Sequence, residues 1–136
     1  MRRRPGGPAG TVPVDLRAQL EQARLETLAL LRALDHAALA PRDLPHAALA
    51  QLAALDADCA EALWALTHSP GALDVDAMVR DTRASLDALT AARAQVRLGV
   101  PDARRRRLQT LEPLIRATLA RREAYNDVPG ADPQNR

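Results

Sequence analysis

The sequence has no phenylalanine and no lysine, and it contains one tryptophan, one tyrosine and one cysteine. Strand-forming residues are scarce, and no valine-, threonine- or aromatic-rich stretch alternates with the period of two that a half-buried strand requires. No apolar run approaches the roughly 18 residues of a membrane-spanning helix. Alanine and leucine dominate instead. We therefore expect an all-α protein that does not span a membrane.

The single cysteine and the N-terminal residues bear on the cellular compartment. Cys59 has no second cysteine for an intrachain disulfide, which fits a reducing compartment. It lies on an apolar helical face beside Asp58, a setting that predicts a buried and unreactive thiol. The arginines at positions 2–4 precede a Pro-Gly-Gly-Pro segment rather than an apolar one, so we expect no secretion signal. These features predict a cytoplasmic protein.

Apolar residues recur at alternating spacings of three and four in several segments, the pattern of amphipathic helices. The most apolar segment runs from Pro45 to Leu66, and its few charges lead us to expect neighbouring helices on more than one of its sides. Further helices are expected over 13–40, 74–98 and 102–125, separated by proline- and glycine-containing turns. Pro113 predicts either a kink in the last helix or a break at Glu112.

The expected fold is an antiparallel bundle of three to four long helices. It occupies residues 12–125, with a disordered tail over 1–11 and a flexible C-terminal tail over 126–136. The predicted core comes from the apolar positions of the first three helices: Leu16, Leu20, Ala23, Thr27, Leu30 and Leu34; Ala48, Leu52, Leu55, Cys59, Ala62 and Leu66; Val75, Val79, Thr82, Leu86, Leu89 and Val96, a series that Arg93 interrupts. The last helix has a narrower apolar face.

The titratable residues form no catalytic or metal-binding pattern. His36, His46 and His68 have no partner at the spacings that metal ligands require. Asp56 and Asp58 point in different directions on a helix, so they do not form an acid–base pair. No glycine-rich phosphate loop or serine nucleophile motif is present. We expect no enzyme activity, no cofactor and no metal.

Four consecutive arginines, Arg104–Arg107, form the densest charge cluster. On a helix they spread over about 300° of the surface, which predicts a solvated face rather than one phosphate-binding groove. A basic patch for an acidic partner remains an alternative. Binding to nucleic acid is not favoured, because the chain has no convincing helix-turn-helix and almost no aromatic residues for stacking. The net charge of +2 is too small to indicate a nucleic-acid or membrane partner.

Three local features of the sequence form one pattern. A long first helix ends in Ala-Pro-Arg-Asp-Leu (40–44), and the second helix carries Leu49, Leu52 and Leu55. A Pro70-Gly71 turn then precedes a third helix, and the last helix ends in Tyr-Asn-Asp-Val-Pro-Gly (125–130). Together these features resemble the flagellar type III export chaperones of the FlgN type, from which the chain differs at 95–98, where the family has asparagines. The resemblance implies a cytoplasmic chaperone that binds the C-terminal helices of hook–filament junction proteins and delivers them for export.

A partner's amphipathic helix can complete the narrow apolar stripe of the last helix. We therefore expect exposed apolar contacts on that helix with basic residues at their rim: Leu108, Leu111, Leu114, Ile115 and Leu119, with Arg104, Arg107 and Arg116. The alternative is that these leucines are ordinary core residues of the last helix. Two other functions remain open: a structural coiled-coil protein that self-associates as a homodimer without a client, and a nucleic-acid accessory protein acting through the arginine cluster.

Overall fold

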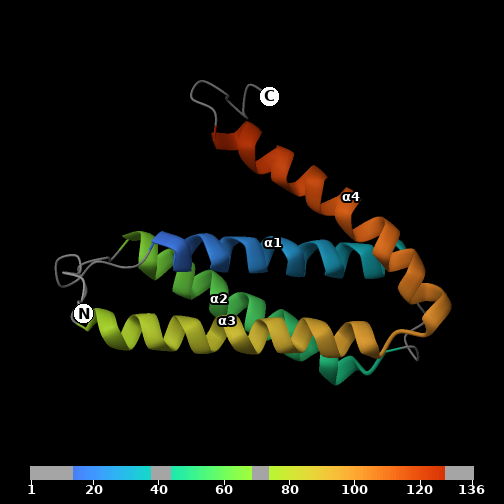
Figure 1. Cartoon of the computed structure of the whole chain (residues 1–136), viewed down its shortest axis with the longest axis horizontal. Coiled ribbons are helices and arrows are strands. Elements are labelled where there is room, and N and C mark those ends of the chain that lie inside the picture. The colour runs from blue at the N-terminus through green and yellow to red at the C-terminus, as the bar shows by residue number, and fades with distance from the viewer. Residues whose placement is uncertain (1–13, 38–43, 69–73, 128–136) are drawn as a thin grey trace, which may run out of the picture.

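The computed structural model describes residues 14–37, 44–68 and 74–127. These residues form four helices, α1 (Val14–His36), α2 (His46–His68), α3 (Val75–Leu98) and α4 (Asp102–Asp127), and no strand. Consecutive helices run in opposite directions, and α1, α2 and α3 lie together along most of their length (Figure 1). The predicted all-α bundle is confirmed. Both predicted tails lie largely outside the described residues, as do most of the turns at 38–43 and 69–73.

The ends of α3 show how local sequence sets the helix boundaries. The Asp74 carboxylate accepts a hydrogen bond from the backbone N–H of Ala77 at 2.9 Å, so Asp74 is the predicted N-cap. At the other end, the N–H of Gly99 donates to the carbonyls of Gln95 and Val96, each at 3.1 Å. A methyl group on Gly99 would lie 3.2 Å from a methyl of Leu44, so glycine leaves room for the start of α2 to pack here.

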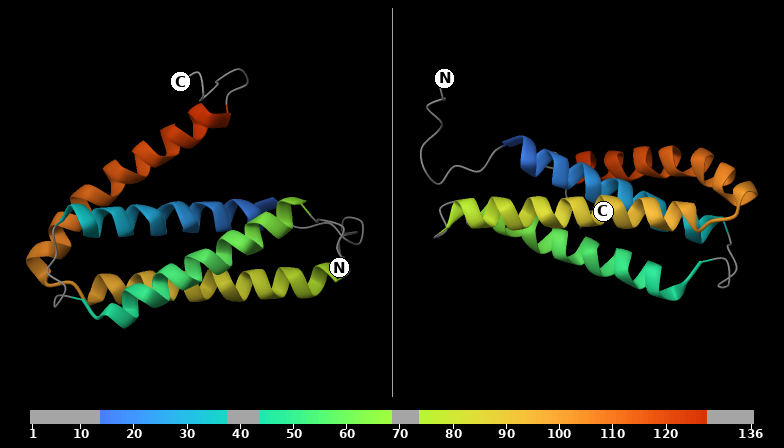
Figure 2. Two further views of the ribbon diagram at one scale, coloured as in Figure 1. Left: turned by 180° about the vertical axis from the view of Figure 1, so that it is seen from behind. Right: turned by 60° about the horizontal axis from the view of Figure 1, so that its bottom comes forward.

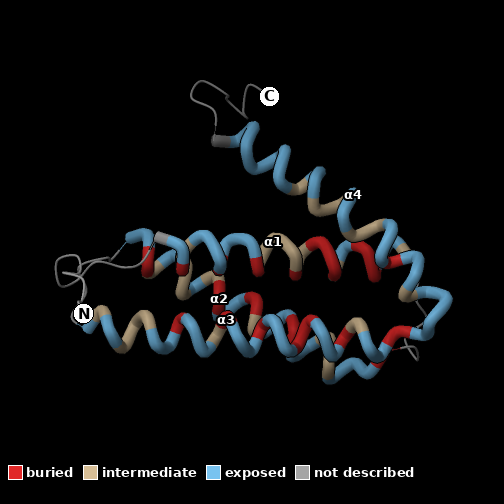
Figure 3. The backbone as a smooth tube through the Cα atoms, in the orientation of Figure 1, coloured by how far each residue is buried: buried red, intermediate tan, exposed pale blue. Residues whose placement is uncertain are grey.

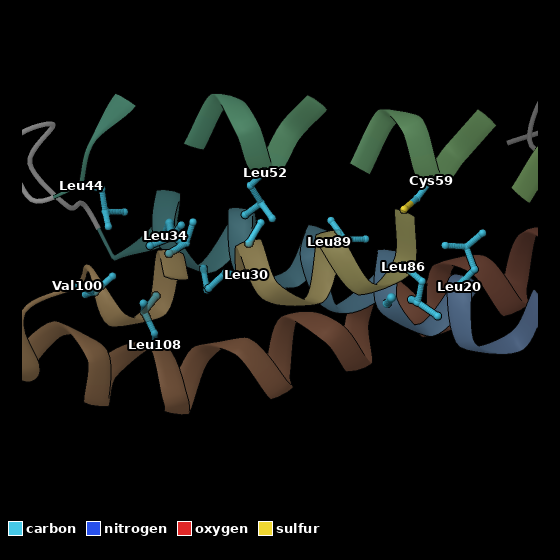
Figure 4. Close-up of a cluster of buried hydrophobic side chains, with 14 of the residues drawn as sticks. Leu20, Leu30, Leu34, Leu44, Leu52, Cys59, Leu86, Leu89, Val100 and Leu108 are labelled. Atoms are coloured by element: carbon cyan, nitrogen blue, oxygen red, sulfur yellow. The ribbon is translucent and has the colours of Figure 1, made fainter. Parts of the chain in front are cut away.

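The hydrophobic core lies between α1, α2 and α3, with a contribution from the start of α4. Figure 4 shows leucines of the first three helices meeting along the bundle, with Leu108 of α4 at one end beside Val100. All six core positions predicted for α1 are buried, and so are four of those predicted for α3, together with Arg93. Because these positions recur every three or four residues, each helix presents one continuous apolar stripe to its neighbours.

Helix α2 is less enclosed than its sequence predicts. It packs against both α1 and α3, as expected, but its buried residues, Leu52, Asp56, Cys59 and Leu66, share one face. Alanines make up most of the opposite face, and Trp64 is largely exposed. An exposed alanine presents only one methyl group to water, which makes this apolar composition compatible with a solvent-facing helix.

Helix α4 packs mainly against α1 and diverges from the other three helices toward its C-terminus (Figure 1). It continues through Pro113, so the predicted alternative of a break at Glu112 is wrong. Pro113 has no N–H to donate to the carbonyl of Gln109, and the ribbon of α4 is curved (Figure 2, right). Burial falls along the helix, and residues 120–126 are exposed (Figure 3). The second half of α4 therefore stands apart from the core.

Candidate functional site

Polar contacts hold α2 against the N-terminal half of α1. The Arg24 guanidinium donates two hydrogen bonds to the Asp56 carboxylate, Nε to Oδ1 at 3.1 Å and Nη2 to Oδ2 at 2.9 Å. This bidentate geometry raises the pKa of Arg24 above its ordinary value. One turn from the start of α1, Arg17 donates to the carbonyl of Leu66 at 3.0 Å. These bonds fix the distance between the two helices.

A second polar cluster joins α4 to the bundle through Glu26 of α1. The Glu26 carboxylate accepts hydrogen bonds from Arg93 of α3 at 2.8 Å and from Arg116 of α4 at 3.3 Å. Arg93 also donates to the carbonyl of Ala23 at 3.2 Å, and burial lowers the pKa of its guanidinium. Arg97 of α3 pairs with Glu112 of α4. The described ion pairs therefore anchor α4 up to Arg116.

Beyond this anchor, a groove of about 700 Å³ opens between α1, the end of α2 and the second half of α4. Its apolar surface comes from half-buried leucines of three helices: Leu25 and Leu28 of α1, Leu63 of α2 and Leu119 of α4. Its polar rim contains Glu21, Gln22, Arg24, Arg32, Arg122, Glu123 and Asn126. No residue of α3 lines it. The groove thus lies on the side of α1 that faces away from α3.

The groove exists because α1 has two apolar faces. Leu25 follows Ala23 by two residues and Leu28 precedes Leu30 by two, a step of about 200° around a helix. Ala23 and Leu30 are in the core, so Leu25 and Leu28 point nearly the opposite way. Helices α2, α3 and α4 each contact α1. They leave the side between α2 and α4 uncovered.

The structure separates the leucines that the sequence groups together on α4. Leu108 is 2% exposed and belongs to the core, so the expectation that it is available to a partner is wrong. Leu111 and Ile115 are half-buried and pack against the same core. Leu119 lines the groove, whereas Leu114 is 63% exposed and does not line it. The apolar contacts expected on one stripe are therefore distributed over three environments.

The three basic residues expected at the rim do not lie together. Arg116 pairs with Glu26 of its own bundle rather than standing free at a rim. Arg104 and Arg107 are exposed in the first two turns of α4, more than three turns before its first groove residue, Leu119, and Arg105 of the same cluster pairs with Asp102. The arginine cluster covers several sides of the helix, as its spacing predicts.

The groove residues that the sequence does not single out are Leu25, Leu28 and Leu63. They appear only as apolar residues beside a stronger stripe. A signal is nevertheless present, because the two leucines of α1 lie three residues apart and on the face opposite the core stripe. Leu63 has no such signal, since its position next to α1 depends on how α1 and α2 pack.

Trp64 is a largely exposed aromatic residue near the end of α2. It follows Cys59 by five residues, or about 140° around the helix, and the Cys59 thiol faces α3, where it donates to the carbonyl of Ser85 at 3.6 Å. Trp64 therefore lies on the side of α2 away from α3. Its ring stacks on His68, with centroids 4.4 Å apart and an interplanar angle of 16°. It is the sole tryptophan, and it immediately follows a groove residue.

The Cys59 thiol is a further group of chemical interest in the described ranges. Cys59 is buried, as predicted, and burial raises the pKa of its thiol to about 11, with the neighbouring Asp56 acting in the same direction. It is a thiol at neutral pH. Within the described ranges, no three or more histidine, cysteine, aspartate and glutamate side chains gather in a way that would hold a metal ion.

A second depression, of about 510 Å³, lies between α1 and α3. The Glu26–Arg93 ion pair occupies its wall, and Leu86, its one leucine, is a buried core residue. It offers no exposed leucine to a partner. The groove between α2 and α4 is therefore the stronger candidate site.

None of the helices in the described ranges has both the length and the apolar character needed to cross a membrane. No protein-family model, no curated protein and no solved structure matches the chain. The features that bear on function are therefore the groove itself and the local sequence resemblance.

Proposed function

We propose that this chain is a non-enzymatic binding protein that holds an amphipathic helix of a partner protein in the groove between α2 and α4. One observation carries the proposal: four leucines from three helices remain half-buried around an open groove, although the core positions of α1 and α3 are well covered. A helix laid over Leu25 and Leu28 would contact α2 on one side and α4 on the other. It would cover the uncovered side of α1.

The dimensions of the groove suit a helix of moderate length. Its residues on α1 run from Ala18 to Arg32, a rise of roughly 20 Å at 1.5 Å per residue. Such a length accommodates about four helical turns, with apolar anchors at every third or fourth residue. A few buried leucine-sized anchors, less the entropic cost of association, give an affinity on the order of micromolar.

The identity of the partner comes from the sequence resemblance. On that basis the partner helices are the C-terminal helices of hook–filament junction proteins, and the chain is a small cytoplasmic chaperone for flagellar type III export. The motifs at 40–44 and 125–130 lie mostly outside the described residues. The groove supports helix binding in general, and the resemblance supports this particular client.

The experiment is a fluorescence titration that uses Trp64 as the reporter. A synthetic peptide covering the C-terminal helix of a hook–filament junction protein, synthesised without tryptophan, is added to the full chain and to two variants. Leu119→Ser removes a groove leucine, and Leu114→Ser removes an exposed leucine of the same helix as the matched control. We expect Leu119→Ser to weaken binding about tenfold and Leu114→Ser less than twofold. No binding, or equal effects of both variants, would refute the proposal.

Self-association is the second candidate function, because α4 also has an apolar outer surface. Leu114 and Tyr125 are both largely exposed, and eleven residues place them on the same side of the helix. Paired with the same surface of a second copy, they would form an antiparallel helix pair. Light scattering distinguishes the candidates: a stable dimer that Leu114→Ser dissociates, together with no peptide binding, would favour a structural protein without a client.

A further inference from the structure

Charge is unevenly distributed along the bundle. One end contains the C-termini of α1 and α3 and the start of α4, and the other contains the start of α1, the end of α2 and the start of α3 (Figure 1). Arginines outnumber acids two to one at the first end, and acids outnumber arginines at the other. The first end carries Arg32, Arg97 and Arg104–Arg107 with Asp35, Asp102 and Glu112; the other carries Asp15, Glu21, Glu61, Asp74, Asp76 and Asp81 with Arg17, Arg80 and Arg83.

The rim of the groove has the same polarity. Glu21 and Glu123 lie toward the acidic end, and Arg122 offsets one of them. Arg24, midway along, is already paired with Asp56. At the other end of the rim Arg32 is exposed. A partner in the groove therefore meets two carboxylates and one arginine toward the start of α1, and Arg32 near its end.

We propose that the bound helix carries opposite charges at its two ends and lies with its acidic end over Arg32. Its basic end then lies between Glu21 and Glu123. This inference rests on the proposed function, because it assigns the charge pattern and the placement of the partner in the same groove. Rim charges contribute little to affinity but select the orientation, since the reversed placement brings like charges together at both ends.

The test uses an 18-residue model helix with leucines at every third or fourth position, glutamates in its first turn and lysines in its last. Acidic residues in the first turn also stabilise the free helix through its dipole. A nitroxide label at the acidic end of the peptide broadens nearby protein resonances in an NMR spectrum. We expect the broadening around Arg32 and neighbouring Ala33, and none around Ala18 at the other end of the groove.

Charge substitution gives a second readout. Arg32→Glu should weaken binding of the model helix about three- to fivefold at low salt, an effect that shrinks as salt is added. The control Arg106→Glu, an exposed arginine at the same end but outside the groove, should change it less than twofold. A peptide with the two charge clusters exchanged should bind Arg32→Glu better than the unaltered chain.

The outcomes separate the two proposals. Broadening around Ala18, or equal effects of Arg32→Glu and Arg106→Glu, overturns the assigned placement and leaves helix binding intact. If neither the model helix nor the peptide with exchanged charge clusters binds, helix binding itself is overturned, and the placement with it. A groove already occupied by a second copy, seen as a dimer that Arg32→Glu dissociates, overturns the assignment to a partner protein.

Discussion

Replacing Glu26 with glutamine removes the one negative charge that two arginines of different helices share. Arg93 reaches it from α3 and Arg116 from α4, at 2.8 and 3.3 Å. Glutamine keeps the shape and one acceptor oxygen but no charge. The Arg93 side chain is 9% exposed, so the substitution leaves a nearly buried cation without its counter-ion.

The expected cost follows from these exposures. Removing one partner of a fully buried pair costs roughly 3–5 kcal/mol. Glu26 is 26% exposed, and Arg93 keeps its hydrogen bond to the Ala23 carbonyl, so about 2 kcal/mol is expected here. The Arg116 side chain is 39% exposed, and its pair with Glu26 should contribute less than about 1 kcal/mol to the unfolding free energy.

The assay is urea unfolding of Glu26→Gln, Arg116→Gln and the double variant, followed by circular dichroism. We expect Glu26→Gln to lower the unfolding free energy by about 2 kcal/mol and Arg116→Gln by less than about half of that. The double-variant cycle should give a small coupling between the two residues. A loss for Glu26→Gln below about 0.5 kcal/mol, or a larger loss for Arg116→Gln, would refute the view that the buried contact to Arg93 dominates.

Three further predictions concern other parts of the bundle. The folded-state pKa of Cys59 is raised to about 11, so its stabilisation is complete below the unfolded pKa and is lost as the pH rises toward 11. Because the chain has no lysine, unfolding under reducing conditions should show stability falling by about 1–2 kcal/mol between pH 8 and 10, and Cys59→Ala should remove most of this slope; an unchanged slope would contradict the assignment. Asp74→Ala should cost about 1 kcal/mol of unfolding free energy through the lost N-cap, against a smaller loss for Asp76→Ala, and equal losses would argue against the cap. Pro113→Ala should stabilise the chain by about 1–3 kcal/mol in the same assay, since it restores a helix hydrogen bond, and destabilisation would show that the curvature of α4 is needed for packing.

The core of α1 and α3 could be predicted from the sequence because their apolar residues recur at a fixed helical period. Leu16, Leu20 and Leu30 are buried for that reason, and Asp74 begins α3 because its side chain can cap a helix. The apolar composition of α2 overstates how much of that helix is buried. Its many alanines raise its apolar fraction, although only the face toward α1 and α3 is buried.

The groove could not be predicted, because periodicity describes one helix at a time. It identifies Leu25 and Leu28 as apolar, but it does not tell which neighbour covers them. That depends on the direction in which α4 leaves the bundle, set by the contacts of Arg97, Arg116 and Leu108 and by the curved helix around Pro113. For the same reason the sequence places the leucines of α4 on one stripe, although among them only Leu119 lines the groove.

The central claim, that a partner helix binds over the second apolar face of α1, can be tested with leucine methyl resonances. The chain is labelled at its leucine methyl groups and titrated with the junction-protein peptide. We expect the resonances of Leu25, Leu28, Leu63 and Leu119 to shift together, and those of the exposed Leu98 and Leu114 to stay in place. Shifts confined to Leu98 and Leu114, or no shifts at a peptide concentration well above micromolar, would contradict the account.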